Sequence, residues 1–425
     1  MQDKHVEIAR AIQSIVGPGH VTANLSLKID GLTPNLLARP ASAEEVAACL
    51  KVCSQFDAAV IPAGRMSWLE YGNPVKRADV VLSLDRMCRI IDYSAADLTA
   101  TVGAGLSLTE FNEMTMKQRQ WLPLDPPGFK SASLGAVAAC NSSGALRLGF
   151  GTPRDYVIGL KLAHADGTES KSGGRVVKNV AGYDLNKLYV GSYGTLAVIT
   201  ELTFKLRPLP ERSSTLMITS RNRGPLFLLA RKVLASELQP ASVVLTRRLP
   251  SASVQLPDDA LLIRFIDSEA AVGHQLSSVL ESSGEDFKTT QLTEAEAEAV
   301  WSEVADFDTS AIRVRFSVPL SAVPAEFEKA FPAHVECVAC ADIGAGIIRF
   351  AFDADERFVV AQIKALRANA VAAGGSLVIE KAPAEVRGKA DAWGDVGSTA
   401  PLMRSVKDRF DPGSLLNPGK FVAGI

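Results

Sequence analysis

The sequence predicts an α+β protein of two domains, and three observations lead to this fold class. The 425 residues exceed what one ordinary hydrophobic core holds. The segment Arg207–Arg212, which contains two prolines, is typical of a linker. Strand and helix patterns follow one rhythm before this linker and a different one after it.

The first half opens with a helix that a capping box at 42–45 starts and that extends to Phe56. Short apolar runs bounded by polar turns predict three strands, at Ala58–Pro62, Asp79–Leu84 and Leu98–Val102. The loop that follows the first of these strands is rich in small residues.

A second capping box, at 107–110, predicts a helix that reaches about Gln120. A proline-rich turn and a segment of small residues, 131–144, precede the next strand at 156–164. The pair Asp166-Gly167 directly follows that strand and is typical of a hairpin turn.

The stretch 174–204 has the ingredients of a ligand-binding loop rather than of ordinary core. An apolar run, a tight turn and one amphipathic helical turn precede a buried strand, at 176–180, 182–184, 185–189 and 196–204. Its three glycines, Gly182, Gly191 and Gly194, are costly unless the backbone adopts positive φ or admits a ligand. For any one of them, turn chemistry alone is the better explanation, and the ordered set is what indicates a ligand.

The second half alternates strands and helices in an order that resembles split β-α-β-β-α-β units, which place helices over an antiparallel sheet. The predicted strands lie at 214–219, 241–247, 260–266, 312–318, 335–340 and 346–352. The predicted helices lie at 224–236, 268–283 and 356–373. The segment 284–310 fits this scheme poorly.

Composition excludes several classes of function. The 45 Lys and Arg residues nearly balance 47 Asp and Glu residues, so the chain has no basic footprint for nucleic acid or anionic lipid. No apolar run approaches the roughly 18–20 residues that span a bilayer. The first residues alternate charged and apolar side chains at helical spacing, unlike a secretory signal. We therefore expect a soluble cytoplasmic protein without a transmembrane segment.

Six scattered cysteines fit reduced thiols better than a disulfide framework. Cys49 and Cys53 lie four residues apart on a predicted helix and are expected to face the core. Cys337 and Cys340, with His334 upstream, have the spacing of metal ligands. A zinc site needs a fourth ligand, and an iron–sulfur cluster needs four cysteines. We therefore predict no metal site and interpret the pair as small residues of a buried strand.

The common nucleotide and hydrolase motifs are absent. Gly103-Ala-Gly105 and Gly344-Ala-Gly346 both lack the third glycine of a Rossmann motif. Neither a Walker A lysine motif nor a Gly-x-Ser-x-Gly elbow occurs. What remains is a set of Gly-, Ser- and Pro-rich loops after strands, whose backbone N–H groups can cradle a pyrophosphate. For the loop 62–68 alone, a plain surface turn is an equal alternative.

A series of short motifs follows in order along the chain: Pro62-Ala-Gly-Arg-Met-Ser67, Val102-Gly-Ala-Gly105, Pro123-Leu-Asp-Pro-Pro127, Ser133-Leu-Gly-Ala136, Gly151-Thr-Pro-Arg-Asp155, Asn179-Val-Ala-Gly-Tyr-Asp184, Gly194-Thr-Leu-Ala-Val-Ile-Thr200 and Phe410-Asp-Pro-Gly-Ser-Leu-Leu-Asn-Pro-Gly-Lys420. As a set they resemble the FAD-binding domain of the vanillyl-alcohol oxidase and p-cresol methylhydroxylase (PCMH) flavoproteins. Within that family the chain most resembles the E-type flavoprotein subunit of bacterial glycolate oxidase. The resemblance covers about 37–208 and the tail 405–421.

The resemblance implies a domain organisation. A PCMH-type FAD-binding domain of two subdomains would occupy 37–208, preceded by a helical segment at 1–36. A ferredoxin-like α+β cap domain would occupy 213–400. The C-terminal segment, 401–425, would pack back on the FAD-binding domain.

The resemblance also implies which residues bind the cofactor. The loop 62–67 would hold the FAD pyrophosphate through backbone amides, and 133–135 would continue that cradle. Residues 154–155 would pass beneath the flavin, and 198–199 would lie beside the adenosine. Asn417 would reach the isoalloxazine ring, although a turn residue before proline is an equal interpretation of it. The full predicted set is Pro62, Ala63, Gly64, Arg65, Met66, Ser67, Pro126, Ser133, Leu134, Gly135, Asn141, Gly144, Arg154, Asp155, Gly194, Val198, Ile199 and Asn417.

Two departures from the family pattern bear on function. The loop 62–68 carries neither histidine nor cysteine, which predicts noncovalent FAD. The similar D-type dehydrogenases carry a histidine-bearing Gly-Asp-Gly-Asn-x-His motif in the cap, whereas this chain has Ala341-Asp-Ile-Gly-Ala-Gly-Ile-Ile-Arg349. A histidine is the usual base near neutral pH, or the ligand of a metal that orients the acid.

We predict an FAD-dependent oxidoreductase subunit of a glycolate oxidase complex, with no catalytic residue assigned. The chain would oxidise glycolate, D-lactate or a related 2-hydroxy acid, with Arg154, Arg349 or Lys381 pairing with the substrate carboxylate. For Arg349 and Lys381 an ordinary surface ion pair is the favoured interpretation. A self-standing dehydrogenase is one alternative.

The other alternative is an accessory flavoprotein or scaffold, beside a sister flavoprotein and an iron–sulfur subunit that carries electrons onward. The missing histidine favours this second function for the chain itself. Through such partners the chain would be cytoplasmic or peripheral to the inner membrane.

Overall fold

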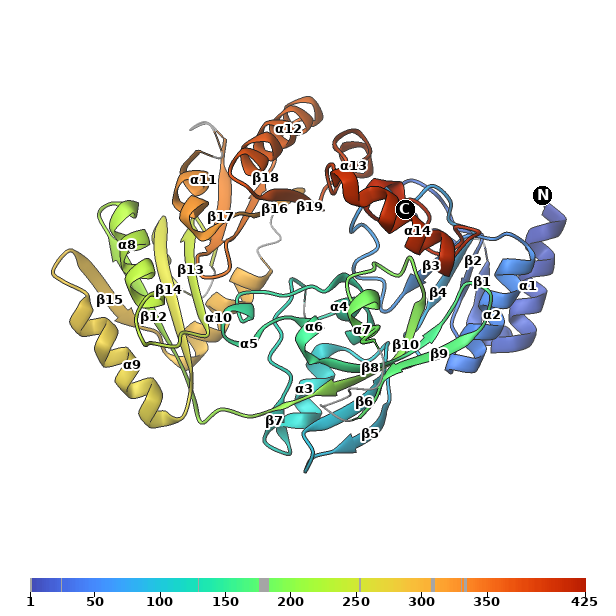
Figure 1. Ribbon diagram of the computed structural model, residues 1–425, viewed down its shortest axis with the longest axis horizontal. Coiled ribbons are helices and arrows are strands. Elements are labelled where there is room, and N and C mark those ends of the chain that lie inside the picture. The colour runs from blue at the N-terminus through green and yellow to red at the C-terminus, as the bar shows by residue number, and fades with distance from the viewer. Residues whose placement is uncertain are drawn as a thin grey trace.

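The computed structural model describes residues 2–23, 25–128, 130–175, 183–251, 254–306, 310–329, 331 and 335–425. The predicted segment 176–180, Gly182 and His334 lie outside these residues. Figure 1 shows one large sheet with its helices on the left and two smaller sheets on the right and below. The helices near the C-terminus lie above the junction between these parts (Figure 1).

The first small sheet has the strand order β1-β2-β4-β3, formed by Val21–Ala23, Leu36–Ala38, Val80–Ser83 and Val60–Ala63. The last three strands run parallel. Helices α1 (Gln2–Val16) and α2 (Ala43–Gln55) pack beside it. The hydroxyl of Ser42 accepts a hydrogen bond from the amide of Glu45, so the predicted cap and helix are confirmed.

The second small sheet is antiparallel, with the order β5-β6-β10-β8-β9, formed by Ile90–Ser94, Thr99–Gly103, Val198–Lys205, Val157–Ala163 and Glu169–Gly173. The predicted turn at Asp166-Gly167 joins β8 to β9, and Gly167 has a φ of 84°. Short helices lie around this sheet: α4 (Leu134–Cys140), α5 (Arg147–Phe150), α6 (Pro153–Tyr156) and α7 (Asn186–Tyr189). Both small sheets share one hydrophobic cluster.

Two sequence predictions in this region were wrong in detail. The second capped helix, α3 (Leu108–Met116), ends earlier than expected, and Arg119, three residues further on, adopts a positive φ of 55° that turns the chain towards a strand. Gln120 therefore lies in a strand, β7 (Gln120–Trp121), which pairs with β11 (Arg207–Pro208). The segment expected to be a plain linker is thus anchored to the first half by this pairing.

The large sheet has eight antiparallel strands in the order β15-β12-β14-β13-β17-β18-β16-β19. Their bounds are Phe287–Gln291, Arg212–Ser220, Asp259–Asp267, Ser242–Arg247, Cys337–Asp342, Ile347–Phe352, Ile312–Ser317 and Ser376–Lys381. Along the chain they form two successive β-α-β-β-α-β units, which meet where β13 pairs with β17. The predicted split units are therefore confirmed.

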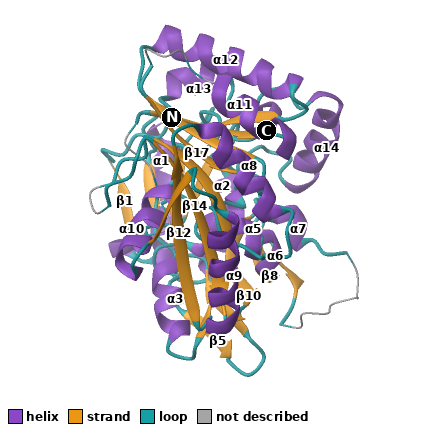
Figure 2. Ribbon diagram, turned by 90° about the vertical axis from the view of Figure 1, so that its left-hand side faces the viewer, coloured by secondary structure: helices purple, strands orange, loops and turns teal. Residues whose placement is uncertain are grey.

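Helices cover the large sheet unevenly (Figure 2). One face packs against α8 (Arg223–Leu234), α9 (Glu269–Ser282), α11 (Val323–Lys329) and α12 (Glu356–Ala372). The other face packs in part against α10 (Glu294–Ala305). The segment that fitted the prediction poorly supplies β15, the fourth strand of the first unit, and α10.

After the large sheet the chain returns to the first small sheet. Helices α13 (Ala384–Ala390) and α14 (Ala400–Phe410) lead to a tail in which Leu416 bridges Val60 of β3 in parallel. The amide of Asn417 donates to the Val60 carbonyl at 3.0 Å. Short 3₁₀ turns complete the fold at Pro18–His20, Leu320–Ala322, Gly397–Thr399 and Val422–Gly424. Within the described residues, no helix is both long and apolar enough to cross a membrane.

Candidate cofactor site

A groove of about 790 Å³ lies between the two small sheets. Its walls come from the loop after β3, from α4, from the start of β10 and from the tail. Of the residues predicted to bind FAD, ten line this groove: Pro62, Ala63, Gly64, Arg65, Met66, Ser67, Gly135, Gly194, Val198 and Ile199. Asn417 lines it as well. Four segments that lie far apart in the sequence therefore meet at the predicted place.

Glycines let the walls of the groove approach one another. A Cβ on Gly64 would lie 1.8 Å from the Ser133 hydroxyl oxygen, and one on Gly135 would lie 2.8 Å from the Ala104 carbonyl oxygen. Gly194 has a φ of 64°, which strains a residue with a side chain. A side chain at Gly64 or Gly135 would collide with the neighbouring segment, and one at Gly194 would strain the backbone. These three positions of the groove wall therefore need glycine.

The loop after β3 presents unpaired backbone donors. Among the described residues, the amide N–H groups of Gly64, Arg65, Met66, Ser67 and Trp68 donate to no other group of the chain. Met66 adopts a φ of 59°. Successive free amides that converge on one space form a concave site for an anion, such as the pyrophosphate of a dinucleotide. This loop therefore fits the cofactor that the motifs predict.

The tail supplies a further unpaired group. Asn417 is buried and its Nδ2 donates to the Tyr193 carbonyl at 2.8 Å, but its Oδ1 has no partner within the described chain. A buried amide oxygen without a partner costs about 1–3 kcal/mol. A ligand with a hydrogen-bond donor, such as the flavin ring, would satisfy it. The interpretation of Asn417 as a mere turn residue does not account for this oxygen.

Residues 133–135 shape the groove rather than present free donors. Ser133 caps α4 through the amide of Ala136. The amides of Leu134 and Gly135 already donate to the carbonyls of Leu106 and Ala104. Their expected part in the cradle would therefore be close packing and not hydrogen bonding.

The remaining predicted binders lie outside the groove. Asn141 Oδ1 accepts the amide of Arg154 at 3.1 Å, and the amide of Gly144 donates to the partly buried Asp125 at 3.1 Å. Arg154 is exposed, and Asp155 caps the turn that starts α6. Pro126, also outside, is buried. Arg154 lines neither this groove nor the second cavity described below, so the structure does not place it beside the predicted substrate site.

Among the groove residues that sequence reasoning did not predict, four carry ionisable side chains. Tyr71, Cys140, Tyr193 and Lys420 all line the groove. Lys420 ends a motif quoted above and Tyr193 lies in the stretch 174–204, so both positions carried a signal, whereas Tyr71 and Cys140 had none. Burial raises the pKa of Cys140 to about 12, which keeps its thiol neutral. Burial likewise raises the pKa of Tyr193.

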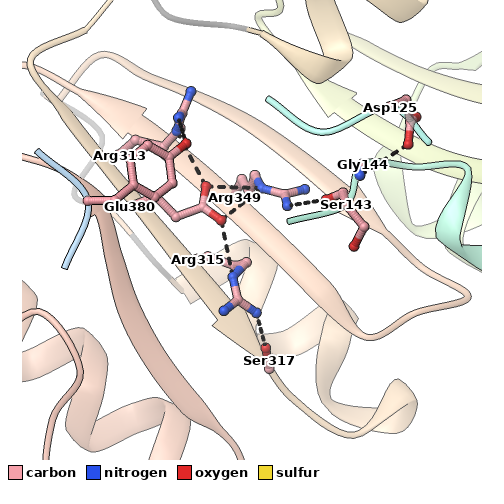
Figure 3. A network of polar contacts seen from close by, with 9 residues as sticks. Asp125, Ser143, Gly144, Arg313, Arg315, Ser317, Arg349 and Glu380 are labelled. Carbon is pink, nitrogen blue, oxygen red and sulfur yellow. Dashed lines mark hydrogen bonds and ion pairs between the residues drawn. The ribbon is translucent and has the colours of Figure 1, made fainter. Parts of the chain in front are cut away.

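A cluster of arginines on the large sheet faces this region (Figure 3). Arg315 of β16 pairs with Arg349 of β18. Arg313 lies two residues before Arg315 on β16, so its side chain is on the same face of the sheet. All three surround Glu380: the Nε atoms lie 3.1 Å from its carboxylate for Arg315 and Arg349, and 3.3 Å for Arg313. Arg313 Nη2 also donates to the Tyr71 hydroxyl at 2.9 Å. The arginine cluster therefore joins the large sheet to the groove wall.

This cluster corrects the interpretation of Arg349 as a surface ion pair. Its side chain is only 12% exposed, and Nη2 donates to the Ser143 carbonyl at 3.0 Å. Burial alone would raise the pKa of Glu380, but the charges of Arg349, Arg313 and Arg315 outweigh it and hold that pKa below its ordinary value. Three guanidinium groups thus share one carboxylate, which leaves the cluster positively charged.

A second cavity, of about 1060 Å³, adjoins the groove and reaches the cluster at Arg313 and Glu380, while Arg315 and Arg349 do not line it. Met66, Ser67 and Tyr71 line both spaces. Lys381 lies in its wall on β19, opposite Arg313 in the sheet, together with Glu380. No histidine of the described chain lines either space. His164, for instance, stacks on Phe410 in the core beside α7.

Asp342, in the motif that lacks the family histidine, gives a pH-dependent prediction. Burial raises its pKa from 3.8 to about 7, against the smaller opposing effects of the Ala345 amide, Arg147 and Arg349. The folded state thus binds the carboxyl proton of Asp342 more tightly than the unfolded state does. The contribution of protonated Asp342 to the free energy of unfolding is complete below about pH 4 and is lost as pH rises through about 7. The loss is at most about 4 kcal/mol.

We expect Asp342→Asn, which cannot ionise and keeps an acceptor for the Ala345 amide, to match the wild type near pH 4 and to exceed its stability at pH 8. Urea unfolding at both pH values measures this difference. Asp286→Asn, at an exposed position, is the matched control. A variant that is less stable than the wild type by the same amount at both pH values would contradict the prediction.

The pair Cys337 and Cys340 lies on β17, as the prediction of a buried strand requires. The two thiols point to opposite faces of the sheet. Cys337 packs in the cluster beneath α8, α9, α11 and α12, and Cys340 packs in the cluster beneath α10. They therefore do not converge on one ion. Among the described residues no group of three or more His, Cys, Asp or Glu side chains is placed to hold a metal.

Comparison with known proteins agrees with this geometry. Residues 34–173 match the FAD binding domain family. Glycolate oxidase subunit GlcD of Bacillus subtilis is 27% identical over 92% of this chain and 89% of its own length. Glycolate oxidase subunit GlcE of Escherichia coli is 34% identical, but over 45% of this chain and 52% of its own length. The chain thus binds FAD, while the narrower E-type assignment stays a prediction.

Among solved structures, p-cresol methylhydroxylase with substrate bound superposes with a TM-score of 0.77 over 99% of this chain and 97% of its own. The two sequences are 13% identical, so this likeness concerns the fold. The predicted α+β, PCMH-type architecture is confirmed. The domain boundaries stay predictions, which the separate hydrophobic clusters of the small and large sheets support.

Proposed function

We propose that this flavoprotein of the p-cresol methylhydroxylase type oxidises the hydroxyl group of a small 2-hydroxy acid, such as glycolate or D-lactate, to the 2-oxo acid. The chemistry that bound FAD supplies is acceptance of a hydride. The observation that carries the proposal is the arginine cluster, because it places largely buried cationic groups next to Tyr71, a residue of the groove wall. The names of the glycolate oxidase relatives agree with it.

A carboxylate is the ligand that such a cluster suits. A guanidinium group presents parallel N–H donors that match the two oxygens of a carboxylate. Glu380 pairs with all three guanidinium groups, but its single negative charge leaves the arginine cluster with a net positive charge. The cavity at 66–71 opens between the cluster and the cofactor groove, so an acid bound there through its carboxylate would present its hydroxyl-bearing carbon towards the groove.

We further propose that FAD is held noncovalently. Electrons would leave through an iron–sulfur partner in a cytoplasmic complex that also contains a sister flavoprotein. The second candidate function is an accessory flavoprotein without substrate oxidation of its own. The observation that favours it is that no histidine of the described chain lines the groove or the cavity. Histidine is the usual proton acceptor near neutral pH.

Anaerobic absorbance spectroscopy of the purified chain distinguishes the two functions. We expect the flavin bands to bleach after glycolate or D-lactate is added, because the arginine cluster lies on this chain. Bands that persist with every 2-hydroxy acid, but bleach once the sister subunits are present, would instead support the accessory function. Glycolate's non-hydroxylated analogue, acetate, serves as the matched control and should leave the bands unchanged.

A further inference from the structure

The segment 69–76, which directly follows the FAD cradle, is fixed by a buried ion cluster from three distant parts of the chain. Arg387 of α13 lies 2.5 Å from Asp30 in the N-terminal region, through Nη2 and Oδ1. Lys420 of the tail lies 3.5 Å from the other oxygen of Asp30. The side chains of Arg387, Asp30 and Lys420 are 1%, 0% and 6% exposed.

Both cations of this cluster also hold a carbonyl of the segment. Arg387 Nη1 donates to the Gly72 carbonyl at 2.9 Å, and Lys420 Nζ donates to the Leu69 carbonyl. These carbonyls flank Tyr71, which lines the cofactor groove. The position of the groove wall therefore depends on the two cations, and their positions depend on the single carboxylate between them.

The surrounding contacts leave the segment little freedom. Asp30 Oδ2 accepts the amide of Val75 at 3.0 Å, and the amide of Asn73 donates to the Lys420 carbonyl at 2.9 Å. Gly72 has a φ of 81°, and a Cβ there would lie 2.6 Å from the Lys420 carbonyl oxygen. The tail thus packs directly on the backbone of the segment.

We propose that Asp30 is a positioning residue for FAD: by pairing with Arg387 and Lys420 it fixes the end of the cradle loop, so FAD affinity depends on docking of the cap-side helix α13 and the tail. Without the carboxylate, two buried cations face each other without a counter-charge. They would move apart and release the carbonyls of Leu69 and Gly72. The inference rests on FAD binding and not on the identity of the substrate.

The test is the dissociation constant of FAD for Asp30→Asn, measured by titrating the apoprotein with FAD and following quenching of flavin fluorescence. We expect it to rise at least tenfold. The melting temperature of the apoprotein is recorded in parallel. A role in overall folding alone would lower that temperature and leave the dissociation constant of the folded fraction unchanged, and that result would overturn the proposal.

Two further variants sharpen the test. Asp57→Asn removes a carboxylate of an exposed ion pair, with Arg77 at 3.1 Å, and should leave FAD affinity within twofold of the wild type. Arg387→Lys keeps the charge beside Asp30 but cannot also reach both Gly72 and Ala382, whose carbonyls the guanidinium contacts. It should weaken FAD binding even where Asp30→Asn does not fold. Unchanged affinity in a folded Arg387→Lys protein would contradict the proposal.

Discussion

Replacing Arg349 by methionine is expected to lower kcat/KM for the 2-hydroxy acid by about 100- to 1000-fold while the protein still binds a full complement of FAD. Arg349 is only 12% exposed, contacts Glu380 and Ser143, and lies outside the wall of the cofactor groove. Truncating one partner of a buried, hydrogen-bonded charge pair costs about 2–5 kcal/mol. Each 1.36 kcal/mol of lost transition-state stabilisation lowers the rate about tenfold.

Steady-state kinetics with an artificial electron acceptor measure this effect, and the flavin absorbance of each preparation normalises the rates. Folding should survive, because Glu380 keeps Arg313 and Arg315 as partners. Arg349→Lys retains the charge without the planar fork and should recover only part of the activity. Arg77→Met, in an exposed ion pair, is the control for loss of any arginine.

A value of kcat/KM for Arg349→Met within a few-fold of the wild type would show that the substrate carboxylate is held elsewhere. Arg313 and Lys381, both in the wall of the second cavity, would then be the next residues to test. The Asp30 proposal would be unaffected by such a result, because its test measures FAD affinity alone.

Local signals in the sequence were enough for most of the fold. Capping boxes placed the starts of α2 and α3, and apolar runs placed β3, β4, β6, β8 and β10 of the small sheets, but not β1, β2, β5 and β9. The order of elements after the linker predicted the split units of the large sheet. What local signals missed were features set by tertiary contact, such as the end of α3, which yields to the pairing of β7 with β11.

The candidate site divides in the same way. Residues of the cradle loop act through their backbone conformation. Glycines in a sequence indicate such positions, so the loop could be predicted. The arginine cluster depends instead on which face of each strand meets the first domain. The alternation of Arg313 and Arg315 was a visible signal, but their convergence on Glu380 arises from the pairing of β16 with β18 and β19. Tyr71 left no pattern, because its role depends on a partner 242 residues away.

Replacing Asp411 by alanine is expected to destabilise the protein by about 3–5 kcal/mol, because removal of one partner leaves a buried charge without compensation. Lys407 Nζ lies 2.6 Å from Asp411 Oδ2, and the two side chains are 2% and 0% exposed. Asp411 also accepts the amides of Leu415 and Leu416, at 3.0 and 2.8 Å, which would lose their partner. The midpoint of urea unfolding should fall with no change in the slope of the transition.

Asp408→Ala removes an exposed carboxylate from the same helix and should change stability by less than about 0.5 kcal/mol. Adding Lys407→Met to Asp411→Ala should restore part of the loss, since the uncompensated cation is then gone. If the single and double variants were equally unstable, the lost amide contacts and not the buried charge would be the cause.

Asp411→Ala should also weaken FAD binding. Asp411 holds Lys407 in place, and Lys407 joins the tail to the wall of the cofactor groove. Its Nζ donates to the carbonyls of Thr195 and Leu416, at 2.8 and 3.0 Å. Thr195 follows Gly194, which lines the groove. Leu416 precedes Asn417, whose Oδ1 has no hydrogen-bond partner within the described chain. The cation is therefore held between the two segments that close one end of the cofactor groove. Burial of an ion pair at this position keeps the last residues of the chain in register with a site that begins at Ile61.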